Sequence, residues 1–155
     1  MLSQQRICIL ITATLLAVPA WAFTPVATLE GAARVVDGDT IRVGRVPVRL
    51  NGIAAPEFSG TRVEIGGIEA TEAMRALVDG RHVVCDLDGS RTHGREVGRC
   101  AVEGQDIGEA MVRAGLARDC PRFSGGDYAA AEQEARAAGR DLSALYALPG
   151  YCQNR

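Results

Sequence analysis

Acidic and arginine side chains are concentrated in one short stretch of the chain. Asp37 and Asp39 flank a glycine there, and Arg49 lies in a run of alternating apolar and polar residues. Glu57 directly follows a proline, and Arg95 follows a glycine further on. Carboxylate oxygens bind hard cations such as Ca²⁺, and the planar fork of arginine donates two hydrogen bonds to a phosphate. Phosphodiester chemistry needs neutralised phosphate oxygens and an activated water, which these residue types could supply.

A meander of three strands is predicted to position the first of these residues. The runs 29–36, 41–43 and 46–50 have the pattern of strands, and a turn at 37–39 joins the first two. In the third run, valine and leucine alternate with arginine and proline, so Arg49 should point away from the apolar face. The sequence therefore predicts an arginine on a stiff strand and two acids at a turn.

The rest of the chain predicts two more strands and three helices. Breakers such as Pro56 mark 52–67 as a loop, and apolar residues at helical spacing between 70 and 78 are followed by Gly80, a helix stop. The remaining elements are strands at 82–87 and 97–102 around a polar turn at 88–95, a helix from the capping residue Asp106 to Gly115, and a helix from the capping residue Asp127 to about 139. This order predicts a small α+β domain built on a closed or nearly closed β-barrel.

Residues 1–22 have the pattern of a signal peptide. Arg6 precedes an apolar run, and Ala20-Trp21-Ala22 fits the small-x-small cleavage rule, so the mature chain should begin at Phe23. The apolar run is shorter than the roughly 20 residues that cross a bilayer, so we expect no membrane anchor. The prediction is an exported protein, periplasmic or secreted, in which residues 23–155 form one monomeric domain.

Four of the five cysteines follow the signal peptide. An even number in an exported chain favours two disulfides, and three pairings are possible. Cys85 and Cys100 lie in successive predicted strands and could bridge them, whereas Cys120 with Cys152 would tie the C-terminal tail to the domain. The absence of a CxxC pair argues against a zinc site.

The charge balance argues against a dedicated basic nucleic-acid binder. All 17 basic residues are arginine, and they stand against 19 acids. Without Arg6 the net charge is near −3. A polyanion would therefore have to be held by a local cluster of arginines, with little long-range attraction.

An ordered set of motifs resembles the staphylococcal nuclease (thermonuclease) family between about residues 29 and 117. The motifs are Val35-Val36-Asp37-Gly38-Asp39-Thr40, Val48-Arg49-Leu50, Gly52-Ile53, Ala55-Pro56-Glu57, Gly94-Arg95 and 109–117. The resemblance implies an OB-fold, a five-stranded β-barrel with three helices. It also implies a nuclease site that takes single-stranded DNA or RNA, in which Arg49 and Arg95 clamp the phosphate and Glu57 activates or positions the attacking water.

The resemblance further implies a calcium site. Asp39 matches a carboxylate ligand, Ala55 the residue that supplies a backbone carbonyl, and Asp37 a supporting acid. Ala54 stands where the family has a second aspartate ligand. Because calcium affinity follows the number of charged ligands, we expect a weak or lost site, and we expect Ala54→Asp to raise calcium affinity.

Two functions follow. The first is an exported, calcium-assisted phosphodiesterase acting on DNA or RNA, with activity reduced by the change at Ala54. The second is a catalytically inactive binding module of the cell envelope. Its link to exopolysaccharide is suggested by exported members of the resembled family that carry labels such as succinoglycan biosynthesis.

Overall fold

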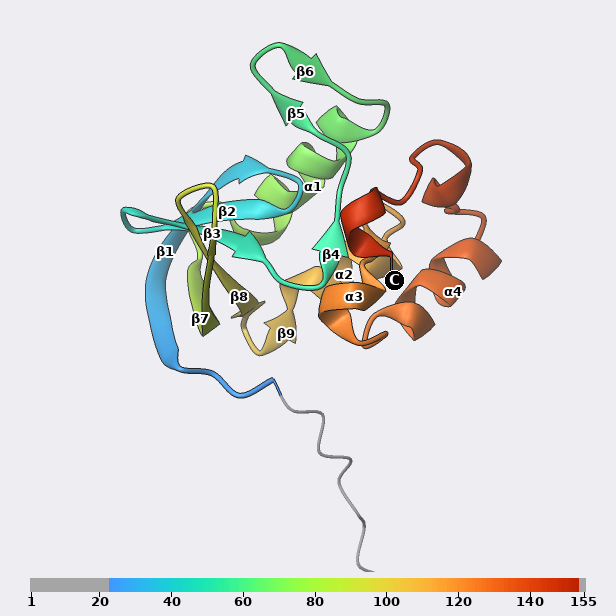
Figure 1. The fold of residues 1–155 in the computed structure, drawn as a ribbon. Helices are drawn as coiled ribbons and strands as arrows, with labels where there is room; N and C mark the ends of the chain where they lie inside the picture. The colour runs from blue at the N-terminus through green and yellow to red at the C-terminus, as the bar shows by residue number, and fades with distance from the viewer. Residues whose placement is uncertain (1–22, 154–155) are drawn as a thin grey trace, which may run out of the picture.

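A computed structural model of the chain describes residues 23–153 (Figure 1). The predicted signal peptide lies outside this part. The strands are β1 (Ala27–Asp37), β2 (Thr40–Val43), β3 (Val46–Leu50), β4 (Ile53–Ala54), β5 (Phe58–Ser59), β6 (Arg62–Val63), β7 (His82–Thr92), β8 (Arg95–Val102), β9 (Gln105–Asp106) and β10 (Arg118–Asp119). The helices are α1 (Gly67–Val78), α2 (Ile107–Arg113), α3 (Pro121–Ser124), α4 (Ala129–Ala137) and the 3₁₀ turns η1 (Leu142–Ala144) and η2 (Gly150–Cys152).

Five strands close into a barrel, which confirms the predicted fold. The sheet runs in the order β3-β2-β1-β7-β8-β9, and parallel pairing of β3 with β8 closes it. Alternate residues of each strand fill the interior, including the fully buried Ile41, Val48 and Val83. Arg49 follows Val48 and lies on the opposite face of β3, as predicted.

Three of the helices correspond to the three predicted ones. α1 packs Ala70, Met74 and Val78 onto the barrel, and α2 begins at Asp106, whose carboxylate accepts a hydrogen bond from the Glu109 amide at 2.8 Å. α2 and α4 lie together on one side of the barrel (Figure 1). No helix of residues 23–153 is long and apolar enough to cross a membrane.

Three local predictions were wrong. The segment 52–67 contains the short strands β4, β5 and β6 rather than a plain loop. The predicted turn at 88–95 is mostly strand, because β7 and β8 extend to a tight hairpin at His93 and Gly94. Asp127 does not cap α4, since its carboxylate pairs with Arg99 instead.

Both expected disulfides are formed. Cys85 and Cys100 lie directly opposite each other on β7 and β8. Cys120 and Cys152 join the start of α3 to η2, so the C-terminal tail returns to lie against β4. This second disulfide brings residues that are remote in sequence close to the predicted site.

Candidate functional site

Asp39 lies at the centre of the site, at the end of the turn between β1 and β2. The residue is 5 % exposed, and the backbone amide of Ala55 donates a hydrogen bond to its Oδ2 at 3.1 Å. The Asp39 amide in turn donates to Asp37 Oδ1 at 3.1 Å. The Asp-Gly-Asp turn thus buries both carboxylates, and Asp37 accepts the hydrogen bond of the Asp39 amide.

Arg49 forms a buried ion pair with Asp39. The distance from Arg49 Nη2 to Asp39 Oδ2 is 2.9 Å, and the two side chains are 13 % and 8 % exposed. Burial alone lowers the pKa of Arg49, but the charge of Asp39 and a hydrogen bond to Tyr151 outweigh burial, and the net direction is upward. Arg49 is therefore a permanent cation beside Asp39, engaged by the protein's own carboxylate.

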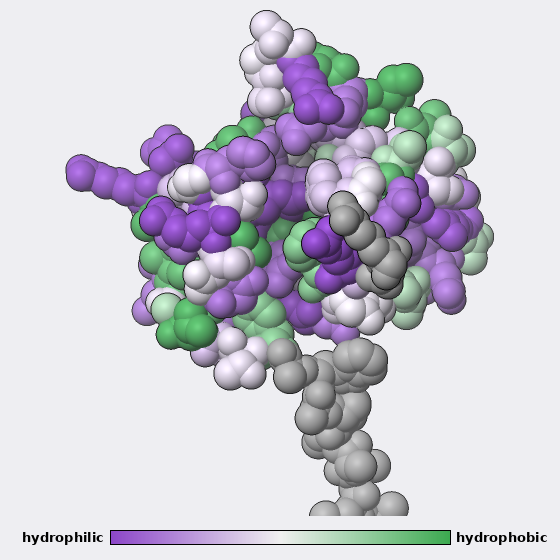
Figure 2. Space-filling model, in the orientation of Figure 1, coloured by the Kyte–Doolittle hydropathy of each residue, from purple (hydrophilic) through white to green (hydrophobic). Residues whose placement is uncertain are grey.

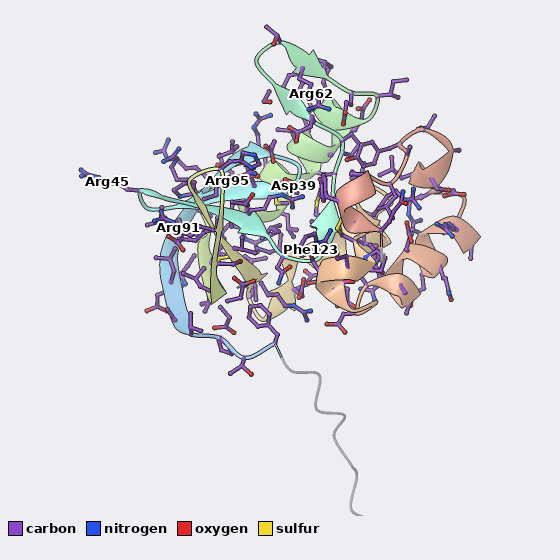
Figure 3. The ribbon with its side chains drawn as sticks, in the orientation of Figure 1. Asp39, Arg45, Arg62, Arg91, Arg95 and Phe123 are labelled. Carbon is purple, nitrogen blue, oxygen red and sulfur yellow. A yellow bond between two sulfur atoms is a disulfide. The ribbon has the colours of Figure 1, made fainter. Side chains whose placement is uncertain are left out.

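Arg95 reaches the same cluster from the β7–β8 hairpin. Its Nη1 donates to the hydroxyl of Thr40 at 3.1 Å, and that hydroxyl donates to Asp39 Oδ1 at 3.1 Å. Figure 3 shows Arg95 and Asp39 side by side. Thr40 therefore connects the second arginine to the central carboxylate, a role that the sequence analysis missed, although Thr40 belongs to the Asp-Gly-Asp-Thr motif.

Glu57 borders the site without joining its hydrogen bonds. The residue is half-buried, and its backbone amide donates to Glu64 Oε2 at 2.9 Å. Its charge contributes to raising the pKa of Asp39, which places Glu57 within electrostatic reach of the cluster. Of the predicted catalytic residues, Arg49 contacts Asp39 directly and Arg95 is connected to it through Thr40, whereas no hydrogen bond or ion pair among residues 23–153 joins the Glu57 side chain to Asp39.

The carboxyl of Asp39 titrates far above its usual range. Burial raises its pKa to about 6 from 3.8, and the acids Asp37 and Glu57 add to this, whereas Arg49 and the Ala55 amide oppose it. At neutral pH the carboxyl is charged and paired with Arg49. Below pH about 6 it takes up a proton and releases its hold on the guanidinium.

This pKa predicts a specific dependence of stability on pH. Because the folded pKa lies above the unfolded one, the contribution of Asp39 to stability is present below pH 3.8 and is lost as the pH rises through about 6. The free energy of unfolding of Asp39→Asn, relative to wild type, should therefore rise by about 2 kcal/mol between roughly pH 4 and pH 8. Denaturant titrations across this range test the prediction, and a constant difference would contradict it.

The residues around Asp39 do not fit a calcium ion. Calcium takes six to eight oxygen ligands. In residues 23–153, no three His, Cys, Asp or Glu side chains are grouped so that they could hold a metal ion. Asp39 Oδ2 is already bonded to Arg49 and to the Ala55 amide, and Ala54 supplies no side-chain oxygen. The guanidinium of Arg49 thus neutralises the charge of Asp39, which a bound cation would otherwise do.

Ala54 packs into a second apolar cluster formed by the C-terminal tail. Its side chain is fully buried against the Cys120–Cys152 disulfide, with Tyr146 and Leu148 at the edge. The same tail carries Tyr151, which is near enough to Arg49 to help raise the pKa of that arginine, so the tail borders the site. The sequence could not reveal this, since nothing in the local pattern around 146–152 indicates where the tail lies.

The packing of Ala54 changes the expected result of Ala54→Asp. The new carboxylate would lie against the disulfide in an apolar cluster, so we expect a loss of about 1–3 kcal/mol in the free energy of unfolding. Ala54→Ser should lower the free energy of unfolding less, because the serine side chain is smaller than that of aspartate and carries no charge. The measurement is denaturant unfolding with and without calcium. Calcium that restores the stability of Ala54→Asp would show that the substituted carboxylate completes a metal site after all.

Comparison with known proteins identifies the family of the chain. Residues 47–143 match the family described as staphylococcal nuclease homologue. The succinoglycan biosynthesis protein ExoI of Rhizobium meliloti (strain 1021) is 32 % identical over 120 residues, which cover 72 % of this chain and 63 % of that protein. Protein ParB of Escherichia coli is 33 % identical over 135 residues, 76 % of this chain and 71 % of that protein.

This chain therefore spans less than two thirds of the length of ExoI. The family match covers β3, which carries Arg49, the hairpin that carries Arg95, and α1, α2 and α4. The match and the closed barrel agree in assigning the chain to one family. The chain belongs to the staphylococcal nuclease homologue family.

Proposed function

We propose that the chain binds the phosphodiester backbone of single-stranded DNA or RNA at Arg95 and retains at most slow phosphodiesterase turnover. The observation that carries this proposal is the state of Arg95. Its guanidinium is half-buried and held by Thr40, and it pairs with no carboxylate among residues 23–153. A fixed, uncompensated arginine fork is a ready site for a phosphate.

The same geometry supports slow turnover. In this proposal Arg95 binds the phosphate and stabilises the charge of the transition state, while Glu57 positions the attacking water. Arg49 could contribute only by leaving Asp39, which would cost the buried pair its mutual stabilisation. The calcium site of the resembled family is weak or lost in this proposal, because Asp39 is neutralised internally.

Export is part of the proposal. Two disulfides are typical of proteins that mature in an oxidising compartment, and residues 1–22 have a signal-peptide pattern. The protein would then meet nucleic acid in the periplasm or outside the cell.

The test compares the purified, oxidised protein with its Arg95→Ala variant. Binding of labelled single-stranded DNA and its cleavage are measured with Ca²⁺ and with EDTA. We expect binding that is lost in the variant, and cleavage that is slow in the wild type and absent in the variant. Arg122→Ala removes an arginine outside the Asp39 cluster and serves as the control. Equal binding by wild type and Arg95→Ala would refute the proposal.

A second candidate is a catalytically inactive module of the cell envelope. It is favoured by the internal pairing of Asp39 with Arg49 and by the burial of Ala54 under the tail. The similarity to a protein named for succinoglycan biosynthesis suggests an exopolysaccharide connection. If the protein binds DNA through Arg95 but does not cleave it, the protein is a binding module without catalysis. If it binds an anionic polysaccharide instead of DNA, the envelope role is favoured.

A further inference from the structure

A group of three exposed arginines lies on the outer surface of the barrel, beside the site. Arg34 is on β1, Arg42 is on β2, and Arg45 is in the turn between β2 and β3. No carboxylate of residues 23–153 forms an ion pair with any of the three. We call Arg34, Arg42 and Arg45 the arginine strip.

The strip places like charges next to one another. Arg34 and Arg42 are direct partners in the antiparallel register of β1 and β2, where side chains stand about 5 Å apart at Cβ. Like charges in this position destabilise a sheet. Arg42 also donates to the backbone carbonyl of Arg45 at 3.1 Å, which holds it toward the turn. Within residues 23–153 no acidic side chain is paired with these charges, whereas a bound polyanion would neutralise them.

The strip is continuous with the site. Arg42 is two residues from Thr40 on β2, so both side chains lie on the same face, roughly 7 Å apart along the strand. Thr40 accepts the hydrogen bond from Arg95 and lies opposite Arg49 in the register of β2 and β3. Figure 3 shows Arg45 at the end of the β2–β3 hairpin, with Arg95 nearer Asp39. The surface over these hairpins is hydrophilic (Figure 2).

We propose that one nucleic-acid strand binds at both places. One of its phosphodiesters lies at Arg95, and its neighbouring phosphates bind the arginine strip. This inference rests on the proposed function and extends it from one phosphate to a path over β2 and β1. The Arg95 side chain reaches from β8 to the Thr40 hydroxyl on β2, and Arg42 lies on the same face of β2, so a nucleic-acid strand bound at Arg95 can continue over Arg42. Because the chain carries no basic excess, such a local path is how it can hold a polyanion.

The experiment uses Arg34→Gln/Arg42→Gln, which removes two charges and keeps most of the side-chain length. Its control, Arg136→Gln/Arg140→Gln, removes two exposed charges at the end of α4. Affinity for a labelled twelve-nucleotide oligothymidylate is measured by fluorescence anisotropy over a series of salt concentrations, and affinity for a thymidine dinucleotide by NMR. The unfolding midpoint of each variant shows whether it remains folded.

We expect the strip variant to weaken binding of the long oligonucleotide and to flatten its salt dependence. The slope of log K against log salt should become less steep by about 1.4, since each phosphate contact on a single strand contributes about 0.7. Binding of the dinucleotide should not change, because its single phosphodiester would be held at Arg95 and leaves no phosphate for the strip. The control variant should behave like the wild type in both assays.

The outcomes separate this inference from the proposed function. If Arg95→Ala abolishes dinucleotide binding while the strip variant leaves the long oligonucleotide unaffected, the site is correct and the path is wrong. If only the strip variant matters, the path is correct and Arg95 is not the phosphate site. If polygalacturonate competes for the strip as strongly as the oligonucleotide does, the occupant is an acidic polysaccharide and the proposal is overturned. A protein that binds no oligonucleotide would overturn it as well.

Discussion

Replacing Arg49 with methionine should lower the free energy of unfolding by about 3 kcal/mol near pH 8. The substitution leaves the charge of Asp39 buried next to Asp37, with no cation to pair with it. Breaking a buried pair by removing one partner is costly, because the remaining charge has lost its hydration and its counter-ion. Methionine is long enough to fill most of the space of the arginine stem, so the loss reports on charge more than on packing.

The pH dependence of this loss is its specific signature. Near pH 5 the carboxyl of Asp39, whose pKa is already raised to about 6, should be protonated, and the variant should regain most of its stability. The double variant Arg49→Met/Asp39→Asn should recover stability at both pH values. Arg95→Met is the matched control, since Arg95 bonds to the Thr40 hydroxyl and not to a carboxylate. A loss of equal size in both arginine variants, or one that does not vary with pH, would contradict the ion-pair account.

Removing the Cys120–Cys152 disulfide should lower the free energy of unfolding by about 3–4 kcal/mol. The two cysteines are 32 residues apart, so the disulfide restricts a long loop of the unfolded chain. Cys120→Ala/Cys152→Ala should also loosen the tail, which is otherwise held by the packing of Tyr146 and Leu148 against Ala54 and by a hydrogen bond from Arg118 Nη1 to the Tyr146 carbonyl at 3.2 Å. The loosened tail would uncover the side of the site that it borders, and the affinity for oligonucleotides at Arg95 should increase.

The other disulfide supplies the control for this prediction. Cys85→Ala/Cys100→Ala opens a bond between adjacent strands, with a sequence separation of 15, and should cost about 3 kcal/mol. Because Cys85 and Cys100 lie within the barrel interior, their loss should leave oligonucleotide affinity unchanged. Thermal or denaturant unfolding and anisotropy titrations of both variants decide the matter. Equal affinity changes in the two variants would show that the tail does not limit access to the site.

Patterns of short range predicted most of the barrel correctly. Alternation along β3 predicted that Val48 would face inward and Arg49 outward, and the capping residue Asp106 predicted the start of α2. These features depend on residues within one turn or one pleat of each other, where periodicity and capping are strong. The same reasoning failed at Asp127, because the ion pair with Arg99 from β8 took the carboxylate away from the helix end.

The contents of the site depended on contacts that the sequence does not contain. The motifs indicated Asp39, Arg49 and Arg95 as a set, but they did not indicate that Arg49 would bind Asp39 directly. Likewise, the sequence indicates only that Ala54 lacks a ligand carboxylate, whereas in the structure its methyl group packs against the Cys120–Cys152 disulfide. Which partner a buried charge takes depends on distances across strands, and the pattern along one strand carries no such information.

The sequence by itself determined the strand order of the barrel's first meander, the outward position of Arg49 and the family motifs, but it left three disulfide pairings open, and the structure chose between them. Only the tertiary structure decided that Asp39 is neutralised within the protein, that the tail brings Tyr151 to Arg49, and that Arg34 and Arg42 stand side by side. The physical reason is the range of the forces involved. Propensity and periodicity act over a few residues, whereas burial, ion pairing and chain closure act between residues that only the completed fold brings within a few ångströms.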